Sequence, residues 1–191
     1  MTTATPSSPR SSSTSVLERR ESRLKDGRVA TIRFATPDDA PGITDLINSV
    51  GSEKRFTLRE RATWSLEEER RTVGAADGRG VAFFVAEIDG RISGLLDIER
   101  GQWPKNAHVA ELGMSCVSGC RGVGLGTALL RRALEWADWV GVRKVTLEVF
   151  STNEQAITLY RGMGFEEEGR RHREYLIEGR PVDGVLMARW L

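Results

Sequence analysis

Residues 120–130 of this 191-residue chain read CRGVGLGTALL, with three glycines in five positions followed at once by residues that favour a helix. Glycine at the start of a helix costs conformational entropy and adds no packing, so the expected gain is bare backbone that another group can approach closely. The first N–H groups of a helix have no partner within the helix, and the helix dipole adds partial positive charge there. The stretch therefore predicts a binding site for an anion such as a pyrophosphate.

Two other glycine-rich phosphate motifs do not fit this stretch. A Walker loop needs a lysine directly after its last glycine, whereas Gly126 is followed by Thr127. A dinucleotide-binding fingerprint needs the spacing Gly-x-Gly-x-x-Gly, which the glycines at 122, 124 and 126 break. The stretch does match Arg-x-x-Gly-x-Gly, from Arg121 to Gly126.

Composition limits the classes of partner. The chain has 28 lysines and arginines against 27 acidic residues, and a net charge of +1 creates no field that gathers nucleic acid or a membrane surface. No apolar run approaches the roughly 20 residues of a membrane helix. Two cysteines, Cys116 and Cys120, provide neither a zinc site nor a disulfide framework, so we expect no metal and a cytoplasmic protein.

The chain divides into a tail and one domain. Residues 1–27 are rich in Ser, Thr and Arg and poor in apolar residues, so we expect a flexible tail; an organelle transit peptide is the weaker alternative. Residues 28–191 are long enough for one domain with a real core.

Apolar periodicity and turn residues predict the elements of this domain. We expect, in order, a strand near 29–34, a helix after Thr36, a helix after Ser65, a hairpin over 80–101 turning at Asp89-Gly90, a strand at 108–117, a helix at 127–140, a strand at 144–150, a helix at 153–163 and a terminal hairpin over 165–191 turning near Glu178-Gly179. This order predicts an α/β (α+β) fold with helices on both faces of a sheet.

Several separated motifs, in this order, resemble the GNAT superfamily of acetyl-CoA-dependent N-acetyltransferases. They are FFVAEIDGRISGLL, AELGMSCV, RGVGLGTALL and LEVFSTNEQAITLYRGMGF, and the last carries the family pattern at Asn153, Ala156, Leu159, Tyr160, Gly164 and Phe165. The resemblance covers about residues 82–188. It implies a mixed, splayed central sheet, in which the strand ending at Cys116 parts from the strand ending near Phe150.

The resemblance also implies where acetyl-CoA binds. Its pantetheine arm would lie in the splay and bond the backbone of Cys116 and Val117, and Asn153 would bond the same arm or serve as an ordinary helix cap. Its pyrophosphate would meet the N–H groups of the glycine loop. The implied cofactor-binding residues are Cys116, Val117, Arg121, Gly122, Val123, Gly124, Leu125, Gly126, Thr127 and Asn153.

Acetyl transfer to an amine calls for a base and an acid, because most amines are cationic at neutral pH. In this family a glutamate or a water chain often serves as the base, and Glu111 lies on the matching strand; its other reading is a member of a hydrogen-bond network. Tyr160 matches the family tyrosine that protonates the leaving thiolate. The N–H of Cys116 is the expected donor to the developing oxyanion.

Other reactive side chains are expected to be structural. A thiol at Cys116 invites an acyl-enzyme mechanism, but a small buried residue is the expected role and direct transfer is typical of the family. Cys120 stands where the family often has an aromatic residue. We expect His108 and His172 to be structural rather than bases.

The sequence says least about the identity of the acceptor amine. The family builds its acceptor groove from the region of residues 50–64 and the terminal hairpin, and we expect an α-amino group on an amino acid or short peptide. Glu178, Arg180 and Asp183 could contact it, but a solvated turn is the preferred interpretation. The resemblance also leaves open a protein N-terminal acetyltransferase, a non-catalytic acyl-CoA sensor, and a homodimer paired through edge strands.

Overall fold

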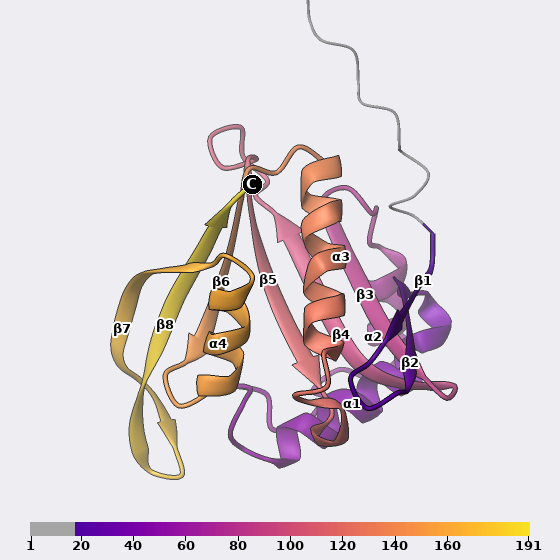
Figure 1. Ribbon diagram of the computed structural model, residues 1–191, viewed down its shortest axis with the longest axis horizontal. Coiled ribbons are helices and arrows are strands. Elements are labelled where there is room, and N and C mark those ends of the chain that lie inside the picture. Colours follow the sequence, from indigo (N-terminus) through magenta and orange to yellow (C-terminus); the bar gives the residue numbers. More distant parts are fainter. Residues whose placement is uncertain (1–17) are drawn as a thin grey trace, which may run out of the picture.

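Eight strands form one mixed sheet in the computed structural model, which describes residues 18–191 (Figure 1). The strand order is β1-β2-β3-β4-β5-β6-β8-β7, and all neighbours are antiparallel except β5 and β6, which run parallel. The strands are β1 (Arg20–Arg23), β2 (Val29–Phe34), β3 (Val81–Ile88), β4 (Arg91–Arg100), β5 (Val109–Cys116), β6 (Lys144–Phe150), β7 (Glu166–Ile177) and β8 (Arg180–Trp190). The helices are η1 (Pro37–Asp39), α1 (Ala40–Ser52), α2 (Leu66–Gly74), η2 (Ser118–Cys120), α3 (Leu125–Trp139) and α4 (Glu154–Gly162).

Local sequence signals account for most element boundaries. Ser65 caps α2 by accepting a hydrogen bond from the Glu68 N–H, and the Glu68 carboxylate accepts one from the Ser65 N–H in return. Asp89 and Gly90 take φ angles of 49° and 74°, as a tight turn between β3 and β4 requires. The predicted hairpins and helices are confirmed, except that the helix after Thr36 opens with the 3-10 turn η1 before α1, and α3 begins two residues before the expected Thr127.

Two apolar layers cover the two faces of the sheet, because successive strand residues point to opposite sides. Phe84 and Leu96 belong to the buried cluster that includes residues of α3 and α4, while their neighbours Val85 and Leu95 belong to the cluster that includes residues of α1 and α2. In Figure 1, α3 and α4 lie in front of the sheet and α1 and α2 behind it. The expectation of helices on both faces is confirmed.

The parallel ladder at the centre of the sheet is short. β5 pairs with β6 only from Val109 to Glu111, opposite residues 144–146, although both strands continue beyond that point. The two strands lie together at the top of Figure 1 and diverge towards the bottom. The splay implied by the resemblance is therefore present, and it begins immediately after Glu111.

The N-terminal boundary differs from the expectation of a tail over residues 1–27. Residues 20–23 form β1 on the free edge of β2, and Leu24 is only 4% exposed in the core. The turn that follows contacts the glycine loop, since the Lys25 N–H donates to the Val123 carbonyl at 2.9 Å and the Arg28 guanidinium to the Gly119 carbonyl at 2.7 Å. The tail prediction is wrong for residues 18–27, because pairing with a sheet edge and one buried leucine order a segment that is otherwise polar; residues 1–17 lie outside the described residues.

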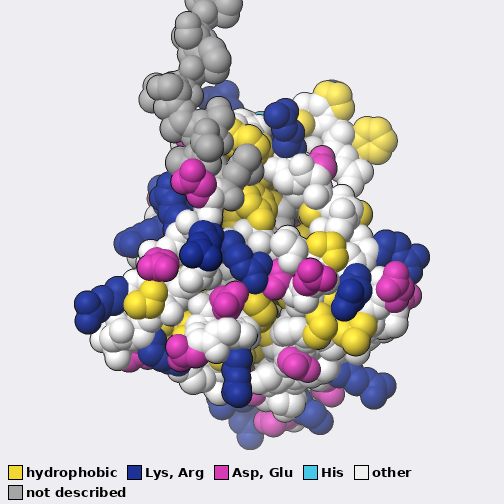
Figure 2. All heavy atoms as spheres, turned by 90° about the vertical axis from the view of Figure 1, so that its right-hand side faces the viewer, with side chains coloured by type: hydrophobic (Ala, Val, Ile, Leu, Met, Phe, Trp, Pro, Cys, Tyr) yellow, Lys and Arg dark blue, Asp and Glu magenta, His cyan; other side chains and the backbone are white. Residues whose placement is uncertain are grey.

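The surface carries mixed charge. Figure 2 shows basic and acidic side chains interspersed with apolar ones on the face it presents. Within residues 18–191, no helix combines the length and hydropathy needed to span a membrane.

Candidate active site

A cavity of about 1110 Å³ occupies the region where β5 and β6 part. It reaches the glycine loop and α4 on one face of the sheet, and α2 and the loop from residue 56 to 64 on the other. We call these the α3/α4 face and the α1/α2 face. The cavity thus connects the two faces through the gap in the sheet.

The edge of β5 along this gap offers unpaired backbone groups. The Val117 N–H donates to the Ser93 carbonyl at 3.1 Å, which fixes Cys116 opposite Gly94 as a pair without mutual hydrogen bonds. By the alternation of an antiparallel ladder, the N–H groups of Met114 and Cys116 then point away from β4 and into the gap. An extended ligand can add to this edge as another strand would.

Val117 does not share this edge, contrary to expectation. Its N–H is bound to Ser93, and its carbonyl accepts from the Cys120 N–H at 3.0 Å. Met114, which sequence reasoning missed, takes its place. The alternating phase of β5 relative to β4 decides this, and a sequence pattern alone does not reveal that phase.

The glycine loop leads into α3 as the sequence predicts. Gly122 and Gly124 have φ angles of 74° and 100°, a backbone region that other residues avoid. Within the described part of the chain, the N–H groups of residues 122–127 donate to no other backbone group, and the first helical bond is from Ala128 to Gly124. A Cβ at Gly124 would meet nothing within 4 Å, so a ligand can approach this backbone closely. The loop residues Val123, Leu125 and Thr127 contribute N–H groups to the same cluster.

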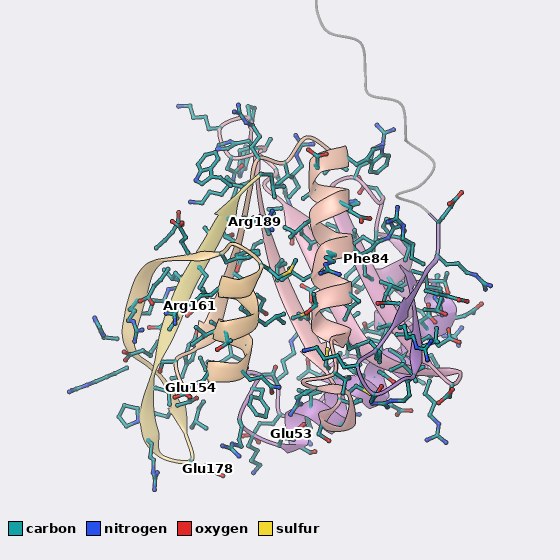
Figure 3. All side chains as sticks on the ribbon, viewed as in Figure 1. Glu53, Phe84, Glu154, Arg161, Glu178 and Arg189 are labelled. Carbon is teal, nitrogen blue, oxygen red and sulfur yellow. The ribbon has the colours of Figure 1, made fainter. Side chains whose placement is uncertain are left out.

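Arg121 lies in the cofactor motif, but its side chain turns towards the other face. Its guanidinium forms two hydrogen bonds of 2.6 Å with the Glu53 carboxylate, and its Nε donates to the Cys116 carbonyl at 3.0 Å. The same guanidinium lies 4.5 Å from the centre of the Phe56 ring. Arg121 lowers the pKa of Glu53 chiefly through these hydrogen bonds. Figure 3 shows Glu53 at the end of the molecule towards which β5 runs.

Helix α4 brings two predicted site residues to the cavity. Asn153 caps the helix, accepting a hydrogen bond from the Ala156 N–H at 3.2 Å, and also lines the cavity. Tyr160 lines it with 6% of its surface exposed. Burial, followed by the nearby Cys116 and Asp97, raises the pKa of Tyr160, so the hydroxyl keeps its proton at neutral pH. A protonated hydroxyl is the form that an acid catalyst needs.

The Cys116 thiol faces the same cavity in an unreactive form. Its removal from water raises the pKa of the thiol to about 12, and the neighbouring Arg121 offsets this only in part. Since the thiolate is the nucleophilic form, a protonated thiol is poorly suited to covalent catalysis.

Three carboxylates on adjacent strands line the cavity on the α1/α2 face: Glu111 of β5, and Asp97 and Glu99 of β4; Glu69 of α2 lines it from the same face. Glu99 stands directly opposite Glu111, and Asp97 opposite Gly113. Asp97 is a site residue that sequence reasoning missed. The available signal was an acidic residue in the middle of the apolar strand sequence SGLLDIE.

The outer wall on this face comes from the regions expected to hold the acceptor. Arg59 lies 4.8 Å from the ring of Trp64, and both line the cavity with Phe56. Across from them, Tyr175 of β7 donates a 2.6 Å hydrogen bond to Glu148, and its pKa is raised to about 12 by desolvation and this partner.

The remaining candidates lie outside the cavity lining. His108 stacks on Trp190 at 6.3 Å, and His172 lies 3.4 Å from the Asp183 carboxylate. Glu178 lies at the tip of the β7–β8 hairpin (Figure 3). Glu178, Arg180 and Asp183 are not among the residues that line the cavity. Within the described part of the chain, no three His, Cys, Asp or Glu side chains are grouped to hold a metal ion.

Comparison with known proteins gives consistent matches. A sequence model described as the acetyltransferase (GNAT) family matches residues 44–165. The L-amino acid N-acetyltransferase AaaT of Escherichia coli K12 is 39% identical over 115 residues, which span 60% of this chain and 71% of AaaT. An N-alpha-acetyltransferase of Sulfurisphaera tokodaii is 34% identical over 119 residues, 56% of this chain and 68% of that protein. The crystal structure of a GNAT-family acetyltransferase from Streptococcus pneumoniae matches with a TM-score of 0.81 and 29% identity, over 85% of this chain and 99% of that one.

Proposed function

Because the chain belongs to the GNAT acetyltransferase family, we propose that it transfers an acetyl group from acetyl-CoA to the primary amine of an amino acid or short peptide. The observation that carries the proposal is the cavity in which the open edge of β5 and the N–H cluster of residues 122–127 lie together. The relative named for L-amino acids supports an amino acid acceptor, and the relative named N-alpha-acetyltransferase supports a peptide amino terminus.

The residues present fit acetyl-CoA. The N–H cluster at the start of α3 suits a pyrophosphate, and the bare backbone at Gly124 leaves it room. The N–H groups of Met114 and Cys116, with the side chain of Asn153, suit the amide groups of a pantetheine arm lying in the splay.

The α1/α2 face suits the acceptor. Its carboxylates favour a cationic amine, and Arg59 supplies the positive charge that would bind the carboxylate of a free amino acid. Acetyl-CoA supplies an acetyl group held as a thioester. A carboxylate on this face, for which Glu111 is the sequence-predicted candidate, takes a proton from the amine directly or through water. Tyr160 donates a proton to the departing sulfur, and the Cys116 N–H donates to the carbonyl oxygen.

The experiment is thiol release from acetyl-CoA, measured over a panel of amino acids, dipeptides, polyamines and aminoglycosides. We expect turnover with amino acids or dipeptides, and a loss of roughly 10²-fold in Tyr160→Phe because an acid catalyst is removed. Tyr175→Phe is the matched control, since Tyr175 lines the same cavity but donates to Glu148.

Other outcomes separate the alternatives. Acetyl-CoA binding without turnover of any acceptor in the panel would contradict the proposal and support the acyl-CoA sensor. Turnover of peptides but not of free amino acids would assign the enzyme to amino termini.

A further inference from the structure

The start of the splay separates the three carboxylates that β4 and β5 place on the α1/α2 face. Glu111 stands at the last position where β5 still pairs with β6. Asp97 stands opposite Gly113, two residues further along β5, where β6 has already moved away. Asp97 therefore faces the open gap, whereas Glu111 faces its closed end and Glu99 stands beside Glu111.

Gly113 keeps the space around Asp97 free. A Cβ at position 113 would lie 3.0 Å from Asp97 Oδ1 and 3.2 Å from Oδ2, closer than ordinary contact. Any side chain there would stand between the carboxylate and the gap. The pair of Asp97 and Gly113 thus leaves a carboxylate open to a group that enters the splay from the α1/α2 face.

Tyr160 reaches the same gap from the other side of the sheet. It belongs to the core cluster formed with α3, whereas Asp97 shares its face with Leu95, which packs in the cluster formed with α1. Asp97 also contributes to the shifted pKa of Tyr160, as expected for groups on either side of one gap. An acid and a carboxylate thus flank the position where the acetyl group would be transferred.

Charged groups from several elements surround Asp97. The Asp97 side chain is exposed to the open cavity, but the protein around it limits hydration and raises the pKa of its carboxyl to about 6; Arg59 lowers it, and Glu111 and Glu99 raise it. A base is most effective when its pKa lies near the working pH. The other ionisable groups lining the cavity are Lys25, Glu69 of α2, Arg121, Cys116, Cys120, Glu148 of β6, Tyr160 of α4 and Tyr175 of β7.

We propose that Asp97 is the catalytic base that removes a proton from the acceptor ammonium, and that Glu111 is a positioning residue for that amine. This inference rests on the proposed function and adds a second carboxylate with a separate role. Asp97 takes one proton from the ammonium and releases it to water in the cavity. The neutral nitrogen then bonds to the acetyl carbon as the carbon–sulfur bond breaks. Tyr160 gives its proton to the sulfur and recovers one from the nitrogen, which completes the amide.

The test compares the pH dependence of kcat/KM for the wild type, Asp97→Asn and Glu111→Gln, with the acceptor that the panel turns over fastest. In the wild type we expect kcat/KM to rise with pH through about 6 as Asp97 ionises. Asp97→Asn should lose this rise of kcat/KM with pH, the acidic limb of the profile. Its kcat/KM at pH 7 should be lower by on the order of 10²-fold or more. Its rate should recover towards pH 9–10, because the free amine then forms without a base. Glu111→Gln should keep the limb and raise KM for the acceptor.

Two further variants control for structural damage. Asp89→Asn makes the same Asp-to-Asn change in the exposed turn between β3 and β4, outside the cavity lining, and should keep both rate and limb. Asp97→Glu retains a carboxylate and should keep a limb at reduced rate. A readout independent of activity is the carboxyl ¹³C shift of Asp97 in the substrate-free protein, which should titrate near 6 and be absent from Asp97→Asn.

The inference is overturned if Glu111→Gln loses the limb while Asp97→Asn keeps it, or if the Asp97 carboxyl titrates near 4. These results differ from failure of the proposed function, in which the wild type itself turns over no acceptor.

Discussion

Cys116 presents two groups to one cavity, and only its backbone suits the reaction. Its N–H points into the gap, while its thiol has a pKa of about 12 and stays protonated. We predict that Cys116→Ala keeps kcat within about tenfold of the wild type, whereas removal of a true covalent nucleophile costs on the order of 10⁶-fold. Steady-state kinetics and mass spectrometry of the enzyme after mixing with acetyl-CoA check this. An acetylated wild-type enzyme that forms and decays at the rate of turnover would contradict it.

Asp97 should reduce the stability of the fold at neutral pH. Asp97 is exposed to the cavity, but reduced hydration there raises the pKa of its carboxyl from 3.8 to about 6 in the folded protein, so ionisation favours the unfolded chain. The destabilisation is complete above pH 6 and is lost as the pH falls towards 4. We therefore predict that Asp97→Asn has a higher Tm than the wild type at pH 8, with a difference that shrinks between pH 6 and pH 4. Thermal unfolding across this range measures it, with Asp89→Asn in the exposed β3–β4 turn as the control. An equal Tm difference at every pH would contradict the assignment.

At the scale of single residues, the sequence predicts which residues lie at the site better than it predicts where their side chains and backbone groups point. Tyr160, Asn153 and the glycines all line the cavity, as the motifs indicate. The side chain of Arg121 points to the opposite face, and the backbone of Val117 is bound elsewhere. The direction of Arg121 depends on its pairing with the distant Glu53, and the bonding of Val117 depends on the phase of β5 against β4.

Arg121 ties the end of α1 to the end of β5. Its two hydrogen bonds to Glu53 join a helix on the α1/α2 face to the glycine loop. We predict a coupling free energy on the order of 1–3 kcal/mol between the two side chains, because a two-pronged charged pair at 21% and 26% exposure is stronger than a typical surface pair. A double-mutant cycle with Arg121→Gln and Glu53→Gln, followed by chemical denaturation, measures it.

The pair of Arg161 and Glu167 provides the matched control. Its atoms lie 3.5 Å apart and its side chains are 59% and 30% exposed, so the coupling should be smaller. The pKa of Glu53 is lowered, so the coupling present at neutral pH should disappear as acid protonates this carboxylate. Equal coupling free energies in the two pairs would indicate that the Arg121–Glu53 pair contributes no more than an ordinary surface ion pair.

Elements with local signals are predicted from sequence, and elements without them are not. Hairpins with Asp-Gly or Glu-Gly turns and helices with capping residues form where expected. Strand β1 has no apolar alternation, and its order comes from pairing with β2 and from the burial of Leu24. Such a strand is stabilised by the sheet already in place, so its own residues carry little signal.

At the scale of the whole molecule, the sheet stays open where β5 leaves β6. The N–H groups of Met114 and Cys116 face this gap, while by the same alternation that of Ser115 bonds to β4. We predict that acetyl-CoA at about 100 times its Kd slows hydrogen exchange of the first two amides by up to about 10²-fold, with a much smaller effect on Ser115. Residue-resolved hydrogen exchange by NMR measures this. Uniform slowing along β5 would indicate general stabilisation instead of an added strand.

The splay itself follows from no pattern within one segment. Hydrophobic periodicity identifies β5 and β6 but not how many of their residues pair, and only the family resemblance implied the gap. The two-sided cavity and the opposed positions of Asp97 and Tyr160 follow from this pairing.

The open backbone edge of β5 and the glycine loop affect how the acceptor specificity of this enzyme can change through mutation. The N–H groups of Met114, Cys116 and residues 122–127 exist whatever side chains those positions carry, provided that the glycines remain. On the proposed function, recognition of the donor is therefore largely independent of side-chain substitutions, whereas the side chains of Arg59, Trp64 and Tyr175 on the proposed acceptor side can be substituted without altering it. A chain built this way can acquire a new acceptor through a few substitutions on one face without rebuilding its hold on the acetyl donor.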